Sequence, residues 1–169
     1  MASGTGTFYI GQQKTDGRHG IVVAMTDEPD LRFSGFSLWI DGRQFPDVSD
    51  FWDGNWLMVR ARMEANGACV ECEGPVLMTV DIKEFRDQLT AMAASLTGEA
   101  TLKGLEPEIN AVLKMQKLGQ VEAVIEITAD PVNQHHRFIL EGDQSYLPGL
   151  IRSCDTILRK FPVIEKRDA

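Results

Sequence analysis

The sequence predicts an α+β domain, in which an antiparallel β-sheet of about 6–8 strands joined as hairpins has two helices packed on one face. Three observations lead to this prediction. Apolar and polar residues alternate with a period of two in several segments, as in half-buried strands. Turn pairs, above all an Asn-Gly, separate these segments. Residues 82–97 and 146–161 instead repeat apolar residues at steps of three and four, which indicates amphipathic helices.

One domain, residues 1–169, accounts for the whole chain, because 169 residues suffice for one core and are too few to favour two. We expect residues 1–19 and 164–169 to be flexible. The first residues show neither the basic start nor the apolar segment of a signal peptide, and three cysteines are an odd number. These features favour a cytoplasmic protein without disulfide bonds. No apolar run approaches the length of a membrane span.

A short apolar run at residues 21–25 predicts one strand, and a second strand pattern covers residues 33–40. Asp41-Gly42 follows it and predicts a two-residue hairpin turn, with residues 43–45 as a short return strand. Pro46 ends this pairing because its nitrogen has no hydrogen to donate. The residues that follow, up to Asp53, read as a polar loop.

Asn66-Gly67 is the strongest hairpin signal, since both residues accept positive φ angles. In residues 56–65, which precede it, alternate positions are apolar and define one buried face. Residues 68–80 form the returning strand. We expect the interruption at Gly74-Pro75 to be a bulge rather than an end.

Asp81 is predicted to cap the first helix, with Glu84 completing a capping box and Gly98 following the last turn. In the second helix Pro148 lies in the first turn, where its missing N–H costs nothing. Between the helices, the period of two predicts strands at residues 99–104, 109–116, 121–128 and 136–140. The order strands, helix, strands, helix is that of an α+β domain.

The net charge of −8 disfavours non-specific binding to nucleic acid, which is itself an anion. It is compatible with two readings. The acidic side chains can form an ordinary solvated surface, or they can form a face that docks a basic protein partner.

Catalytic, metal and cofactor sites find no support in the spacing of reactive residues. Cys69 and Cys72 have the CxxC spacing, but there is no second pair and residues three apart on a strand point to opposite faces. Cys154 lies on the apolar stripe of the last helix, so we expect a buried thiol. The adjacent His135 and His136 have no further ligand at metal-binding spacing. Pairs of glutamates, such as those at 71 and 73, 106 and 108, and 122 and 126, are typical of solvated strand faces.

The segment from Phe51 to Arg60 contains two of the three tryptophans, Trp52 and Trp56, on either side of an Asp-Gly-Asn sequence. Tryptophan serves both as a core anchor and as an interface hot spot. We expect at least one of the two to be largely buried. The candidate partner-binding residues in this segment are Asp50, Trp52, Asp53 and Asn55.

These residues also give the chain a resemblance to a known family. The order and spacing of several short motifs resemble those of the WapI-type immunity proteins. The motifs are Gln44-Phe45-Pro46-Asp47, the run from Phe51 to Val59, the helix residues 85–87 and 96–100, Leu105-Glu106-Pro107, residues 143–148 and Phe161-Pro162. The resemblance spans residues 36–163. Phe51 replaces a tyrosine that is frequent in the family, and residues 1–35 have no counterpart in it.

The resemblance implies a small non-enzymatic protein that binds the toxic domain of a contact-dependent toxin, usually a nuclease, and blocks its active site. Two alternatives stay open. One is a small-ligand-binding protein or enzyme with a site on the concave sheet face, around Trp56, Arg60 and Arg62. The other is a structural or interaction domain that forms a homodimer.

Overall fold

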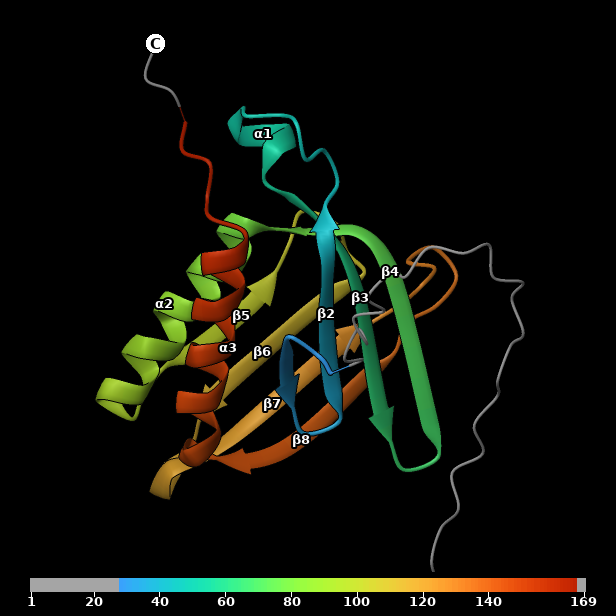
Figure 1. Cartoon of the computed structure of the whole chain (residues 1–169). Coiled ribbons are helices and arrows are strands. Elements are labelled where there is room, and N and C mark those ends of the chain that lie inside the picture. Colours follow the sequence, from blue (N-terminus) through green and yellow to red (C-terminus); the bar gives the residue numbers. More distant parts are fainter. Residues whose placement is uncertain (1–27, 167–169) are drawn as a thin grey trace, which may run out of the picture.

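The computed structural model describes residues 28–166 and confirms the α+β class (Figure 1). The predicted flexible segment 1–19, His19 and the strand predicted at residues 21–25 lie outside the described residues. The described strands are β1 (Leu31–Phe33), β2 (Phe36–Arg43), β3 (Trp56–Ala65), β4 (Ala68–Met78), β5 (Glu99–Lys103), β6 (Ile109–Met115), β7 (Gln120–Ile127) and β8 (Arg137–Asp143). The α-helices are α1 (Phe51–Gly54), α2 (Thr79–Ser95) and α3 (Leu147–Lys160), with single 3₁₀ turns at Lys117–Gly119 and Gln144–Tyr146.

The strands form two antiparallel sheets of four rather than one continuous sheet. Their orders are β1-β2-β3-β4 and β5-β6-β7-β8, so every strand pairs with its neighbour in the sequence. Helix α2 connects the two sheets, and α3 packs against α2 beside them (Figure 1). Sequential pairing explains why hairpin signals predicted the class so directly.

The first hairpin turn is not at Asp41-Gly42, as the sequence predicts, but at Ser34-Gly35. β2 runs through Gly42 to Arg43, and the pairing with β3 is only shifted between Ile40 and Gly42. Gly35 is required at the real turn, because a Cβ there would lie 1.9 Å from the carbonyl oxygen of Glu64. The close approach of the backbones at Gly35 and Glu64, which no local turn signal reveals, therefore sets the position of this turn.

The β3–β4 hairpin agrees with its prediction. Residues 66 and 67 form the turn, and Gly67 has a φ of 81°. Val59 pairs with Gly74 whereas Leu57 pairs with Leu77, so β4 contains the extra residue of the expected bulge. The apolar positions of β3 that share one face are buried, namely Leu57, Val59, Ala61 and Met63.

Helix α2 begins at Thr79, three residues before the predicted start at 82, while α3 matches its prediction within one residue at each end. Asp81 lies inside the first turn, and its carboxylate accepts a 2.7 Å hydrogen bond from the backbone N–H of Met78. Leu96, with φ of 53°, is the left-handed residue that ends the helix, a role predicted for Gly98. An ion pair of 2.9 Å between Arg86 and Asp155 joins α2 to α3.

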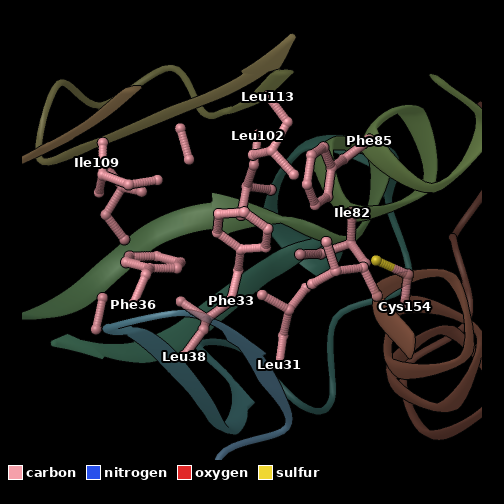
Figure 2. Close-up of a cluster of buried hydrophobic side chains, with 14 of the residues drawn as sticks. Leu31, Phe33, Phe36, Leu38, Ile82, Phe85, Leu102, Ile109, Leu113 and Cys154 are labelled. Carbon is pink, nitrogen blue, oxygen red and sulfur yellow. The ribbon is translucent and has the colours of Figure 1, made fainter. Parts of the chain in front are cut away.

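The core lies between the two sheets and the helices. Figure 2 shows the ring of Phe33 between side chains of both sheets, with Leu102 and Leu113 on one side and Leu31 and Leu38 on the other. Cys154 of α3 is completely buried, as expected. Cys72 is buried and Cys69 is exposed, which confirms that they point to opposite faces of β4.

Asp81 gives a testable pH dependence. Burial raises the pKa of Asp81 to about 6, a rise that the hydrogen bond from Met78 opposes and the charge of Glu84 increases. Because the folded pKa exceeds the unfolded value of about 3.9, folding is penalised above pH 6 and the penalty disappears as the pH falls towards 4. We expect Asp81→Asn, which keeps an acceptor for Met78, to raise the free energy of unfolding by about 1 kcal/mol at pH 7.5 after allowance for solvent screening.

Urea unfolding at pH 4, 5.5 and 7.5 checks this expectation. Asp87 on the same helix is the matched control, because the hydrogen bond from Lys83 lowers its pKa. Asp87→Asn should therefore lose stability at neutral pH and approach the parent protein in acid. A less stable Asp81→Asn at pH 7.5 would contradict the assignment.

Candidate partner-binding site

The segment between β2 and β3 folds as a one-turn helix, α1, instead of the predicted turn and polar loop. Asp50 caps it, since its carboxylate accepts hydrogen bonds from the N–H groups of Trp52 (2.9 Å) and Asp53 (3.0 Å). The N–H of Gly54 then donates to the carbonyl of Asp50 (3.1 Å). An aspartate followed by the four residues of the helical turn is a normal N-cap arrangement, and it holds the backbone of Trp52 in place.

Asn55 fastens this turn to the rest of the molecule. Its side chain is fully buried, and its amide donates to the carbonyls of Phe51 (2.7 Å) and Ile164 (2.9 Å). Its amide oxygen accepts from the N–H of Ile164 (2.9 Å) and from the hydroxyl of Thr79. Both donor hydrogens and both acceptor positions of the amide are therefore used. The three segments joined in this way are α1, the start of α2 and the chain beyond α3.

Gly54 allows the chain beyond α3 to approach so closely. It is buried, and a Cβ at this position would lie 2.7 Å from the Cδ1 atom of Ile164 and 2.7 Å from the carbonyl oxygen of Val48. Ile164, which the sequence assigns to a flexible end, is thus held by two hydrogen bonds to Asn55. The remainder of that end, residues 167–169, lies outside the described residues.

Arg43, at the end of β2, makes a second link between the same segments. Its guanidinium donates to the carbonyl of Gly54 and to the carbonyl of Pro162, which is 119 residues away in the sequence. Partial burial lowers the pKa of Arg43. The scaffold below α1 is therefore built from polar groups that have partners, as partly buried polar groups require.

On the outside of this scaffold, α1 and the loop before it project beyond the ends of β2 and β3 (Figure 1). Trp52 is 58% exposed and Phe45 is 41% exposed. The exposed acids Asp47, Asp50 and Asp53 lie in the same short segment. We refer to Phe45, Asp47, Asp50, Trp52 and Asp53 as the Trp52 surface.

Two aromatic rings of α1 form a corner that holds a cation. The rings of Phe51 and Trp52 are 5.2 Å apart at 85°, an edge-to-face arrangement. The ammonium of Lys166 lies 4.8 Å from the centre of the Phe51 ring and 5.1 Å from that of Trp52. Both distances fall within the range of cation–π attraction.

A separate pocket of about 550 Å³ lies over the first sheet, and its charged and aromatic lining residues are Trp39, Arg60, Arg62, Glu71, Glu73 and Glu108. It contains two of the residues of the small-ligand alternative, but Trp56 is not among its lining residues. Arg60 pairs with Asp41 at 3.1 Å and lies over the Trp39 ring at 5.2 Å. Arg62 pairs with Glu71 at 3.3 Å and with Glu64. Both arginines therefore have carboxylate partners, whereas one oxygen of Glu108 is buried without a hydrogen-bond partner.

The cysteine of this pocket is not activated for nucleophilic chemistry. Burial, reinforced by the charge of Glu108, raises the pKa of the Cys72 thiol to about 12, so the thiolate needed for nucleophilic chemistry is absent at neutral pH. Within residues 28–166 no three His, Cys, Asp or Glu side chains are grouped to hold a metal ion. Asp81, whose pKa is raised to about 6, lies outside this pocket, and its carboxylate accepts the hydrogen bond from Met78 at the start of α2.

The four candidate contact residues therefore separate into two groups. Asp50, Trp52 and Asp53 are exposed on the Trp52 surface, whereas Asn55 is buried and has no surface to offer a partner. Of the two tryptophans, one of which was expected to be largely buried, Trp56 is intermediate in burial and Trp52 is exposed. Sequence reasoning missed Arg43 and Lys166, because their contacts join positions more than a hundred residues apart and leave no local pattern.

Comparison with known proteins identifies the family. A model of the immunity protein WapI-like family matches residues 29–162. The chain belongs to this family. The match confirms the resemblance of the sequence motifs, and it begins at residue 29, so residues 29–35, which were expected to have no counterpart in the family, belong to it. It includes Arg43, Asn55 and Pro162 but ends before Ile164. No curated protein and no solved structure matches the chain. In the part of the chain that the structure describes, every helix is too short or too polar to span a membrane.

The four side-chain hydrogen bonds of Asn55 predict a large loss of stability on substitution. Asn55→Asp keeps the acceptors but places a carboxylate against the carbonyls of Phe51 and Ile164. We expect it to lower the free energy of unfolding by about 3 kcal/mol, since two buried acceptors lose their donors and a charge is buried. Urea unfolding measures the loss.

The matched control is Asn133→Asp, in an exposed turn where the amide of Asn133 donates to Asp130 (2.8 Å). Its cost should stay below about 1 kcal/mol, because water replaces the lost partner. Equal unfolding midpoints for the two variants would show that Asn55 is not the connecting residue that its contacts indicate.

Proposed function

We propose that this protein is a non-enzymatic immunity protein that neutralises a cognate toxin by binding it directly, and that the Trp52 surface makes the contact. The observation that supports this surface is an exposed tryptophan on a rigidly fastened helical turn. It lies inside the region that matches the immunity family. A tightly held aromatic side chain loses little conformational entropy when a partner covers it.

Trp52 is suited to be the energetic centre of such a contact. It is a large side chain that the fold leaves 58% exposed, and Phe45 adds a second exposed ring. Tryptophan is enriched among the residues that dominate binding energy at protein interfaces, especially where neighbouring groups exclude water around it. Asp47, Asp50 and Asp53 supply a polar rim.

The charge of the protein points to the chemistry of the toxin. A nuclease must present a basic surface to its nucleic-acid substrate, and a partner with a net charge of −8 would be attracted to that surface. We therefore propose a nuclease-type toxin whose basic active-site face is covered by the Trp52 surface. The complex would form in the cytoplasm, where such a toxin reaches nucleic acid.

Loss of Trp52 should weaken the complex with the cognate toxin, which is to be sought among the products of the neighbouring genes. We expect Trp52→Ala to raise the dissociation constant about 30-fold, which corresponds to about 2 kcal/mol. Isothermal titration calorimetry measures the affinity, and survival of cells that co-express toxin and variant measures protection. Leu118→Ala is the control, because Leu118 is completely exposed in the turn before β7 and lies outside the proposed contact. If the two variants bind equally, the Trp52 surface is not the contact.

Charge reversal tests the electrostatic part separately. We expect Asp53→Lys to slow association about tenfold at low salt and the difference to shrink as salt is added, because screening removes long-range attraction. Glu141→Lys on β8 makes the same change of net charge at an exposed position outside the Trp52 surface. Stopped-flow association rates should show the larger effect for Asp53. An unmodified protein that neither binds nor protects against the neighbouring toxin would refute the proposed function itself.

A further inference from the structure

The corner between Phe51 and Trp52 is occupied by a side chain of the protein itself. Lys166 reaches it from the chain that runs up beside α1 after α3 (Figure 1). The ammonium contacts both rings at once, at 4.8 Å and 5.1 Å from their centres. Two rings set edge to face at 85°, each within cation–π distance of the same ammonium, can serve as a receptor for one cation.

We propose that this corner is the receptor for a lysine or arginine side chain of the toxin, and that Lys166 occupies it only in the free protein. The inference rests on the proposed function and specifies the chemistry of its contact. The partner's cation would displace Lys166 and take its place over Phe51 and Trp52. An arginine fits especially well, because its planar guanidinium stacks on aromatic faces and is weakly hydrated.

The surroundings of the corner favour a cation from outside. Asp50 and Asp53, on either side of the two rings in the sequence, are exposed acids that attract positive charge. The carboxylate of Asp50 already accepts two backbone hydrogen bonds, which hold it in place. Lys166 is itself exposed, so its release costs little burial.

The connection between Lys166 and the scaffold makes exchange possible without unfolding. The chain is anchored two residues earlier, where the backbone of Ile164 is hydrogen-bonded to Asn55. Lys166 can therefore leave the corner while α1 keeps its position. In this arrangement the lysine is an internal competitor, and it lowers the apparent affinity of the corner for any other cation.

The test uses an oligo-arginine peptide, with the isosteric but uncharged oligo-citrulline peptide as its chemical control. Binding is followed by calorimetry on the full chain. We expect the arginine peptide to bind and the citrulline peptide not to bind. Trp52→Ala should lose at least about tenfold in affinity for the arginine peptide. Thermal unfolding verifies that the exposed Trp52 can be replaced without loss of the fold.

The decisive variant is Lys166→Ala, which removes the competitor. We expect it to bind the arginine peptide at least about threefold more tightly than Lys160→Ala does. Lys160 is the matched control. It too lies over an aromatic ring, that of Phe161 at 5.0 Å, and its removal changes the net charge equally. Any gain common to both variants is long-range electrostatics, and only the excess for Lys166 is competition.

Three results would overturn the inference: equal affinities of Lys166→Ala and Lys160→Ala, equal binding of the citrulline peptide, or undiminished binding by Trp52→Ala. The outcomes also distinguish the two proposals. A tighter Lys166→Ala complex with the peptide, in a protein that gives no protection against the toxin, supports the corner and rejects the proposed function. A protective protein in which Lys166→Ala gains nothing beyond Lys160→Ala supports the function and rejects the corner.

Discussion

The buried amide of Asn55 is the interaction on which the rest of the candidate site depends. One side chain supplies two donors and two acceptors, and their partners are Phe51, Thr79 and, with both its N–H and its carbonyl, Ile164. Such a fully satisfied network is rigid, whereas the loss of any member leaves a buried polar group without a partner. Arg43 adds a second set of bonds between the same segments. The one-turn helix α1 is too short to be stable alone, so its conformation depends on these two residues.

This dependence explains how one short stretch can serve both the fold and the proposed binding surface. Asn55 and Gly54 face inwards and hold the chain together, whereas Trp52 and Asp53 face outwards from the same turn. A large aromatic ring can stay exposed on the monomer because the backbone beneath it is fixed by hydrogen bonds rather than by burial of the ring.

Much of the fold was accessible from sequence because its contacts are local. Each strand pairs with its neighbour in the chain, so alternation and turn pairs such as Asn66-Gly67 sufficed to predict the hairpins and the class. The predictions fail where contacts outside the local pattern determine the backbone conformation. Gly35 turns the chain because it meets the backbone of Glu64, and Asp81 enters the helix because its carboxylate can reach back to Met78. Asn55 looked like a surface residue of a turn, since nothing in the local pattern shows that Ile164 covers it.

The two hydrogen bonds between Asn55 and Ile164 also determine when α1 can take its final conformation during protein synthesis. A ribosome releases the chain from its beginning, so β2, α1 and β3 emerge long before residue 164. Until that residue is available, the amide of Asn55 lacks two of its partners and the turn that presents Trp52 is not fastened. The proposed binding surface would thus take its fixed shape only when residue 164 has been made. A nascent or prematurely terminated chain would contain the entire Trp52 segment and still lack its fixed shape.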